Sequence, residues 1–188
     1  MNHSKIGVRY AKALIETAQS QGILENVYQD VINIEPFFKN DSSILIKVLL
    51  NPIMKKHQKI SLLNRLFQPH IEKLTLQFLQ LILAKGREEY IKDIFRNFIF
   101  KYNEINKIKN VAIITTIEPD KEIVEKITRL IHKIVPNEYK INLNDIKNDE
   151  IIGGFILEVG DYQLDASIKG KLNQIKSNLI NTSHKIKL

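Results

Sequence analysis

Three carboxylates lie close together near the carboxy-terminal end of the sequence and are the first candidates for chemistry. Glu158, Asp161 and Asp165 belong to the stretch IIGGFILEVGDYQLDASIKGKL, residues 151–172. Neighbouring carboxylates can hold a divalent cation or act as a general acid and base. Here Asp161 follows Gly160 at a predicted tight turn, Asp165 comes just before a predicted helix, and Glu158 falls on a solvent position of a strand. We therefore interpret the three as turn, cap and surface residues.

The other residue types that commonly carry catalysis also fail to form a known motif. The chain has no Cys, which excludes disulfides, thiol nucleophiles and thiolate zinc sites. Gly170-Lys171 is followed by Leu172, whereas a phosphate-binding loop needs Ser or Thr there. The motifs therefore indicate no catalytic residue, no metal site and no cofactor, and an enzyme whose site has no recognised motif stays open as a third hypothesis. No metal-ligand spacing relates any two of the histidines, which are His3, His57, His70, His132 and His184.

The stretch that contains the carboxylates is predicted to fold as a β-hairpin followed by a helix. Apolar residues recur with period two over 155–159 and again over 162–164, as in two strands. Ser167 is placed to cap the helix that follows, because a serine hydroxyl accepts hydrogen bonds from free amides of the first turn. Gly153 and Gly154 predict that another backbone approaches the strand entry closely or that the strand bulges. The helix carries an apolar line formed by Ile168, Leu172, Ile175 and Leu179.

Residues 1–106 show only the helical period. Gly22 and Gly86 each follow an apolar periodic segment and are natural helix ends. Because the breaks between segments are short, neighbouring helices should be antiparallel and form a bundle. Six helices are predicted, over about 4–21, 23–39, 42–50, 55–67, 70–85 and 87–106.

The fifth predicted helix is apolar on almost every side. A helix of this kind must be covered all round, so it lies at the centre of the bundle or one face receives a partner. The apolar residues are Leu74, Leu76, Phe78, Leu79, Leu81, Ile82 and Leu83.

From about residue 107 the pattern changes to alternating strands and helices. Residues 111–117 are a β-branched run typical of a buried strand. A helix should begin at Pro119 and Asp120 and continue to about 135, and a second strand should follow over 139–143. The predicted fold class is α+β: a six-helix bundle over 1–106, then a small α/β domain over 107–188 with a β-hairpin and a terminal helix.

Composition and charge leave one alternative open. The 188 residues are 44% hydrophobic and carry a formal net charge of +7. No apolar run approaches the ~18 residues of a membrane span, so we expect a soluble protein that meets a membrane only through partners. A basic chain can bind nucleic acid, and a basic RNA- or ribosome-binding module is therefore the alternative function. Because the lysines are scattered, we expect no direct nucleic-acid contact; salt-sensitive RNA binding would contradict this.

Three motifs resemble one protein family. Residues 9–14, RYAKAL, are similar to its first helix, and residues 83–87, LAKGR, to the junction between its fifth and sixth helices. Residues 153–172 are similar to its carboxy-terminal signature, which is the most specific of the three. The chain resembles, over its whole length, the delta subunit of bacterial F-type ATP synthase, the counterpart of the mitochondrial oligomycin-sensitivity-conferring protein.

The resemblance implies a non-catalytic stator subunit of the peripheral stalk, which lets proton or sodium flow drive ATP synthesis. It implies that 1–106 binds the amino-terminal helix of an alpha subunit and that 107–188 binds the b subunits, at the cytoplasmic face of the inner membrane. The groove for the alpha-subunit helix would lie between the first and fifth helices. Its expected residues are Tyr10, Ala13, Leu14 and Thr17 on one wall, and Phe78, Leu81, Ile82 and Lys85 on the other. The alternative for these residues is plain bundle core.

Overall fold

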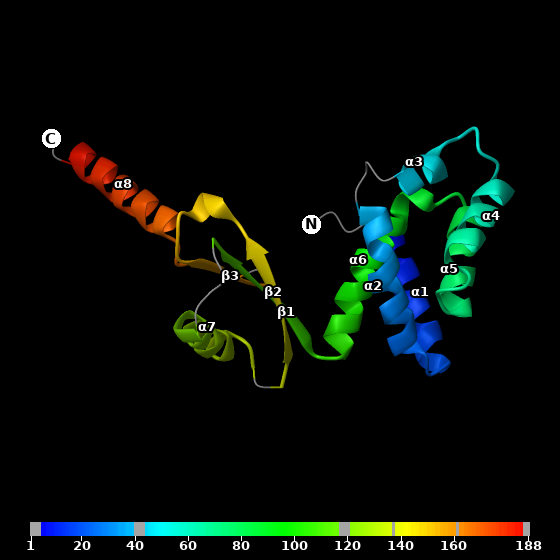
Figure 1. Ribbon diagram of the computed structural model, residues 1–188, viewed down its shortest axis with the longest axis horizontal. Coiled ribbons are helices and arrows are strands. Elements are labelled where there is room, and N and C mark those ends of the chain that lie inside the picture. The colour runs from blue at the N-terminus through cyan, green and yellow to red at the C-terminus, as the bar shows by residue number, and fades with distance from the viewer. Residues whose placement is uncertain (1–4, 40–43, 117–120, 137, 161, 186–188) are drawn as a thin grey trace. The chain divides into compact units, whose positions relative to one another are not determined.

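The computed structural model describes residues 5–39, 44–116, 121–136, 138–160 and 162–185. The chain separates into two compact units, residues 1–106 and 107–188 (Figure 1). The first unit contains helices only, and the second contains a four-stranded sheet. The predicted α+β class is therefore confirmed.

The helical unit follows the predicted segments closely. Gly22 and Gly86 end α1 and α5 with φ of +69° and +64°, which is the left-handed conformation that glycine adopts at helix ends. Pro36 is accommodated inside the last turns of α2. The elements are α1 (Lys5–Ser20), α2 (Leu24–Lys39), α3 (Ile44–Leu50), α4 (Lys56–Phe67), α5 (Lys73–Ala84), the short 3-10 helix η1 (Glu88–Tyr90) and α6 (Ile91–Ile105).

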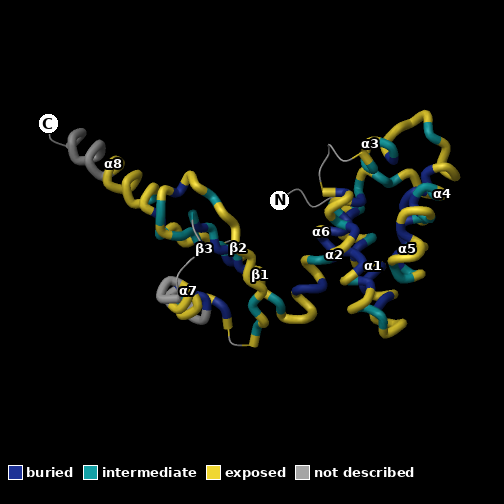
Figure 2. The backbone as a smooth tube through the Cα atoms, viewed as in Figure 1, coloured by how far each residue is buried: buried dark blue, intermediate teal, exposed yellow. Residues whose placement is uncertain are grey.

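One apolar core holds this unit together, and Figure 2 shows buried residues along α1, α2 and α6. Phe38 and Phe95 pack edge to face at 5.5 Å between ring centres. α1 approaches α6 closely at Gly7, where an added Cβ would lie 3.1 Å from the Cβ of Asp93. α1 is thus anchored on α6 by one of its faces.

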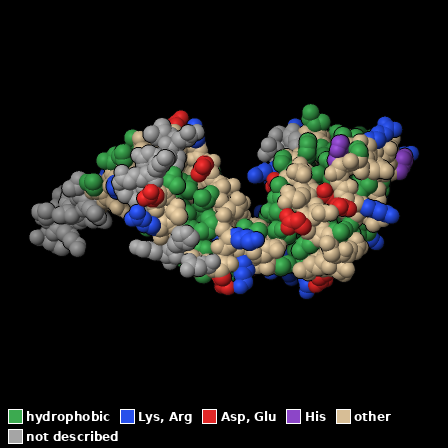
Figure 3. All heavy atoms as spheres, turned by 60° about the horizontal axis from the view of Figure 1, so that its bottom comes forward, with side chains coloured by type: hydrophobic (Ala, Val, Ile, Leu, Met, Phe, Trp, Pro, Cys, Tyr) green, Lys and Arg blue, Asp and Glu red, His purple; other side chains and the backbone are tan. Residues whose placement is uncertain are grey.

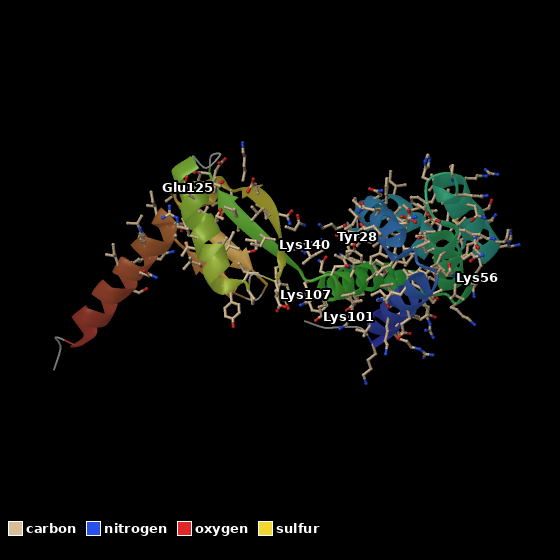
Figure 4. All side chains as sticks on the ribbon, turned by 90° about the horizontal axis from the view of Figure 1, so that it is seen from below. Tyr28, Lys56, Lys101, Lys107, Glu125 and Lys140 are labelled. Atoms are coloured by element: carbon tan, nitrogen blue, oxygen red, sulfur yellow. The ribbon has the colours of Figure 1, made fainter. Side chains whose placement is uncertain are left out.

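The second unit is built on a mixed sheet with the strand order β2-β1-β3-β4. β1 runs parallel to β2, and the pairs β1–β3 and β3–β4 are antiparallel, so the predicted hairpin is present. The β1–β2 pairing begins where Lys140 donates its amide to the carbonyl of Lys107 at 2.8 Å (Figure 4). Pro119, Asp120 and Asp161 lie outside the described residues. The elements are β1 (Ile108–Thr115), α7 (Lys121–Ile134), β2 (Lys140–Lys147), the 3-10 helix η2 (Asp149–Ile151), β3 (Phe155–Val159), β4 (Tyr162–Asp165) and α8 (Ile168–Lys185).

α7 covers one face of the sheet (Figure 1). Alternate residues of the two central strands point toward it, as the pleat requires. The buried set consists of Val111, Ile113, Leu157 and Val159 from the sheet, with Ile127, Ile131 and Val135 from the segment of α7.

The start of α8 confirms two predictions from sequence. Ser167 caps the helix, because its Oγ accepts from the amide of Gly170 at 2.9 Å. Gly154 has φ of +78°, and a Cβ there would lie 2.5 Å from the carbonyl oxygen of Ala166. The structure therefore confirms the close approach of another backbone segment, at Ala166, that was expected at the glycine pair.

Candidate partner-binding groove

An elongated groove of about 510 Å³ lies along α1 and α5 of the helical unit. Its walls mix apolar side chains with a few polar ones, which is the composition of a site for another protein segment. The lining residues are Arg9, Tyr10, Ala13, Leu14 and Thr17 from α1; Leu74, Gln77, Phe78 and Leu81 from α5; and Lys85 and Arg87 just after α5.

The α1 wall follows from two apolar stripes on one helix. Ala11, Ile15 and Ala18 are buried in the core. Positions 9, 10, 13, 14 and 17 are spaced by one, three, one and three residues, so they share the adjacent face of the helix. Ala13 and Thr17 are exposed on this face. The small side chain of Ala13 leaves room for a close approach.

The α5 wall is formed in the same way by a helix with two apolar faces. Leu79, Ile82 and Leu83 are completely buried in the core. Positions 74, 77, 78, 81 and 85 form the neighbouring stripe. Leu81 is 46% exposed there, an unusual state for a leucine in the middle of an apolar helix.

Seven of the eight predicted groove residues line the groove in the structure. The prediction was wrong for Ile82, which does not line it. Ile82 is 0% exposed and belongs to the core. An α-helix has 3.6 residues per turn, so successive residues are rotated by about 100° around its axis. This rotation places Ile82 on the side of α5 that faces the core, whereas Leu81 faces the groove. Spacing alone placed the boundary between the two faces one residue too far round.

Sequence reasoning missed four residues that line the groove: Arg9, Leu74, Gln77 and Arg87. Arg9 lies one helical turn before Ala13, and Leu74 one turn before Phe78, so the helical period could have found both. Arg87 lies in the LAKGR motif but beyond the end of α5. Only the reversal of the chain at Gly86 brings its side chain back to the groove.

Tyr10 links the two walls. Arg87 donates from Nη1 to the Tyr10 hydroxyl at 3.0 Å, and its guanidinium lies 5.3 Å from the centre of the Tyr10 ring. The ring of Phe78 lies 6.2 Å from that of Tyr10 at a tilt of 59°. Because Arg87 follows the end of α5 and Tyr10 lies in the first half of α1, their hydrogen bond shows that the two helices are antiparallel along the groove.

Neighbouring helices hold α5 at both ends. At its amino-terminal end, Asp30 of α2 accepts from the Glu72 amide at 2.8 Å and from the Thr75 hydroxyl at 2.7 Å. At its carboxy-terminal end, Lys56 of α4, labelled in Figure 4, donates to the carbonyl of Ala84 at 3.0 Å. The groove wall is thus held at both ends of α5 by residues that do not line the groove.

Asp30 sits in surroundings that disfavour its charge. Burial raises the pKa of this carboxyl above its ordinary value, and the hydrogen bonds from Thr75 and the Glu72 amide oppose the rise. The carboxylate remains next to the free amides of the first turn of α5, where negative charge is stabilised.

The second unit carries an apolar stripe without a covering element among the described residues. Ile168, Leu172 and Ile175 are spaced by four and three residues along α8 and are 47%, 54% and 56% exposed. Figure 3 shows hydrophobic side chains at the surface of both units. An exposed apolar line of this kind is typical of an interaction surface.

The carboxylates considered first for chemistry have structural roles where they are described. Asp165 Oδ1 accepts from the Ser167 amide at 2.8 Å, and hydrogen bonds from Ser167 lower the pKa of Asp165. Glu158 pairs in register with Gln163 across the hairpin. Within the described ranges, no three His, Asp or Glu side chains gather as a metal site would require. In the same ranges, no helix has the length and apolar character to cross a membrane.

Known proteins are similar to this chain over nearly its whole length. The family described as ATP synthase delta (OSCP) subunit matches residues 6–179. The ATP synthase subunit delta of Cytophaga hutchinsonii is 33% identical over 177 residues, covering 94% of this chain and 95% of that protein. The corresponding subunit of Christiangramia forsetii is 29% identical over the full length of both.

The fold is found in a solved structure as well. A chain in the cryo-EM structure of the Toxoplasma gondii mitochondrial ATP synthase hexamer superposes with a TM-score of 0.71 at 22% identity. The match covers 94% of this chain and 98% of that one, so both units of the fold are included.

Proposed function

The chain belongs to the ATP synthase delta (OSCP) family, and from this premise we propose that its α1–α5 groove binds the amino-terminal helix of an alpha subunit. As a family member the protein is a non-catalytic subunit of the peripheral stalk of F-type ATP synthase. This membership decides against the alternative of an RNA-binding module. The proposal adds the partner and the surface that receives it.

One observation carries the assignment: α5 leaves an apolar face uncovered in a groove whose other wall is α1. The groove is long enough for several helical turns, since lining positions extend from Arg9 to Thr17 and from Leu74 to Lys85. A helix that lays its apolar stripe between two others is an established mode of recognition. Leu81 and the partly exposed Leu74 would be its main apolar contacts, because Leu14 and Phe78 are only 2% and 7% exposed at the base of the groove.

An apolar groove suits the mechanical task of a stator. A stalk must stay attached while torque acts on the head, so the complex needs slow dissociation. Slow dissociation comes from well-packed apolar anchors more than from exposed ion pairs. The partner's helix would pack against α1 and α5 of the amino-terminal unit as an additional helix.

The experiment is a titration of the full-length protein with a peptide of the alpha-subunit amino-terminal helix. Leu81→Asp should weaken binding about thirtyfold or more, since a central apolar contact contributes about 2 kcal/mol. The matched control is Leu66→Asp on α4, because Leu66 is 45% exposed against 46% for Leu81 and does not line the groove. Ala13→Trp should block the same groove from its other wall. Equal affinities of Leu81→Asp and the wild type would refute the assignment.

The carboxy-terminal unit would bind the b subunits of the stalk. The stripe of Ile168, Leu172 and Ile175 on α8 supports this, because b-subunit helices could pack along it. With one unit on the head and the other on the stalk, the protein would hold the head against rotation. We place it at the cytoplasmic face of the inner membrane, attached peripherally through these partners.

A further inference from the structure

The charges along the groove are unevenly distributed. Arg9, Lys85 and Arg87 all line it, and among its described lining residues none is acidic. Arg9 is the first lining residue of α1, and Lys85 and Arg87 are the last ones after α5. Because α1 and α5 are antiparallel along the groove, all three cations lie at the same end.

The opposite end of the groove is neutral. Its lining residues there are Thr17, Leu74 and Gln77. Nearby, Lys73 and Glu72 balance each other in formal charge, and the Glu72 carboxylate accepts from Asn26 at 2.8 Å. Residues 9 and 17 of α1 are about 12 Å apart along the helix, at 1.5 Å per residue. This distance exceeds the Debye screening length of ~8–10 Å at physiological salt, beyond which exposed charges interact only weakly. The two ends are therefore electrostatically distinct.

Carboxylates close to the cationic end are already engaged. Glu88 at this end is bound by Lys59 at 2.6 Å, whereas Glu16 lies next to Thr17 at the opposite end and pairs with Lys12 at 3.6 Å. Glu89 interacts with the hydroxyl of Tyr90. Lys56, bonded to the carbonyl of Ala84, adds positive charge at the end of α5. The field at this end of the groove is thus positive.

Resting on the proposed function, we propose that Arg9, Lys85 and Arg87 receive the acidic end of the visiting helix and thereby fix the direction in which it lies. An apolar stripe holds a helix in a groove with little regard to its direction, because dispersion and apolar burial are not directional. Opposite charges at one end break this symmetry and exclude the reversed arrangement. The occupant is an amphipathic helix with Asp or Glu at one end.

The test uses two designed amphipathic peptides of equal composition, whose apolar stripe reads the same from both ends. One has Glu at its amino-terminal end and Lys at the other; the second has the charges exchanged. Each carries a nitroxide at its amino terminus, and line broadening of backbone amides in the full-length protein reports the direction. The first should broaden the amides of Arg9 and Lys85, and the second those of Thr17 and Leu74.

A double variant tests whether the cations named above determine the direction of the bound peptide. Arg9→Gln with Lys85→Gln should reduce the preference for one direction and weaken binding of both peptides about fivefold to tenfold at low salt, as expected for two exposed charge pairs. Arg87 stays unchanged because it orients Tyr10. The control variant, Lys39→Gln with Lys47→Gln, removes two exposed lysines that do not line the groove and should change neither quantity.

The outcomes separate the two proposals. Reversal of direction with reversal of charge supports the inference. The same direction for both peptides, or equal weakening by the control variant, overturns it while the groove remains a binding site. Failure of both designed peptides to bind also overturns it, and failure of the alpha-subunit peptide as well overturns the proposed function.

Discussion

The Thr75 hydroxyl of α5 donates to the carboxylate of Asp30 on α2 at 2.7 Å, and both residues are buried. The same Asp30 oxygen accepts from the amide of Glu72, the N-cap residue directly before α5. Glu72 makes no capping hydrogen bond of its own with its side chain. α5 is therefore capped by a different helix, and the groove wall depends on α2.

We expect Asp30→Ala to loosen α5. The substitution leaves the Glu72 amide and the Thr75 hydroxyl without their acceptor, a loss of about 2–3 kcal/mol for a buried cap. Hydrogen exchange at the amides of Leu79 and Ile82 should accelerate accordingly. Thr75→Val should have a smaller effect, since one of the two hydrogen bonds remains. Glu16→Ala on the exposed face of α1 is the control; an equal acceleration there would contradict the capping role.

The raised pKa of Asp30 predicts a pH dependence of stability. Burial raises the folded-state value above the ordinary 3.8, so the folded state binds more protons than the unfolded state just above that pH. The contribution of Asp30 to the free energy of unfolding is then complete below about pH 3.8 and decreases as the pH rises through the folded-state pKa. In Asp30→Asn this decrease should be missing. Urea unfolding of both proteins between pH 3 and 7 measures the difference; parallel profiles would contradict it.

Tyr102 should ionise late and stabilise the helical unit through alkaline pH. Its hydroxyl donates to Glu25, and its ring stacks on Tyr28 at 3.7 Å. Burial, the hydrogen bond to Glu25 and the charge of Glu25 raise the pKa of Tyr102 well above 10.0. The stability it contributes is present below pH 10 and is lost as the pH rises through the folded-state value.

The corresponding variant is Tyr102→Phe, which should lower the free energy of unfolding by about 1 kcal/mol at pH 8 and flatten its loss above pH 10. Ultraviolet titration of the folded protein should show one tyrosine that ionises later than the others and is absent from the variant. Tyr162, 75% exposed, serves as the control through Tyr162→Phe. If both variants lost the same late phase, the assignment to Tyr102 would be wrong.

Two glycines in the carboxy-terminal unit allow two effects of a Gly→Ala substitution to be measured separately: the clash of the added Cβ with another backbone segment, and the strain of a positive φ. Gly154 and Gly160 both have positive φ, but an added Cβ meets Ala166 only at Gly154, whereas nothing lies within 4 Å at Gly160. Gly160→Ala should destabilise the unit by about 1–2 kcal/mol, the cost of the left-handed conformation. Gly154→Ala should cost about 3 kcal/mol or more, since the backbone must also shift. Thermal unfolding compares them, and equal losses would show that the approach at Ala166 is relaxed at no cost.

The stripe on α8 predicts a separate loss of binding to the stalk. Leu172→Glu should weaken binding of a carboxy-terminal b-subunit fragment about thirtyfold, because a charge then faces an apolar contact. Asn173→Glu, on an exposed neighbouring position, is the matched control. Surface plasmon resonance with the full-length protein measures both. Binding of the alpha-subunit peptide should be unaffected in either variant, and a loss there would indicate misfolding instead.

The sequence by itself determined the secondary structure and the fold class. Local rules sufficed for this: the helical period and Gly22 and Gly86 define α1 and α5, and alternation with the Ser167 cap defines the hairpin and α8. It also indicated that α5 had more apolar surface than one core could use. These features depend on residues near one another in the chain, so their spacing contains the necessary information.

Only the tertiary structure decided which side of α5 is covered, and this follows from packing between distant segments. Ile82 and Leu81 are equally apolar, yet the placement of α5 against the core buries the first and leaves the second in the groove. The cap from Asp30, and the return of Arg87 to Tyr10, join residues 45 and 77 positions apart. No local pattern encodes such pairs, because their contact exists only once the helices have packed.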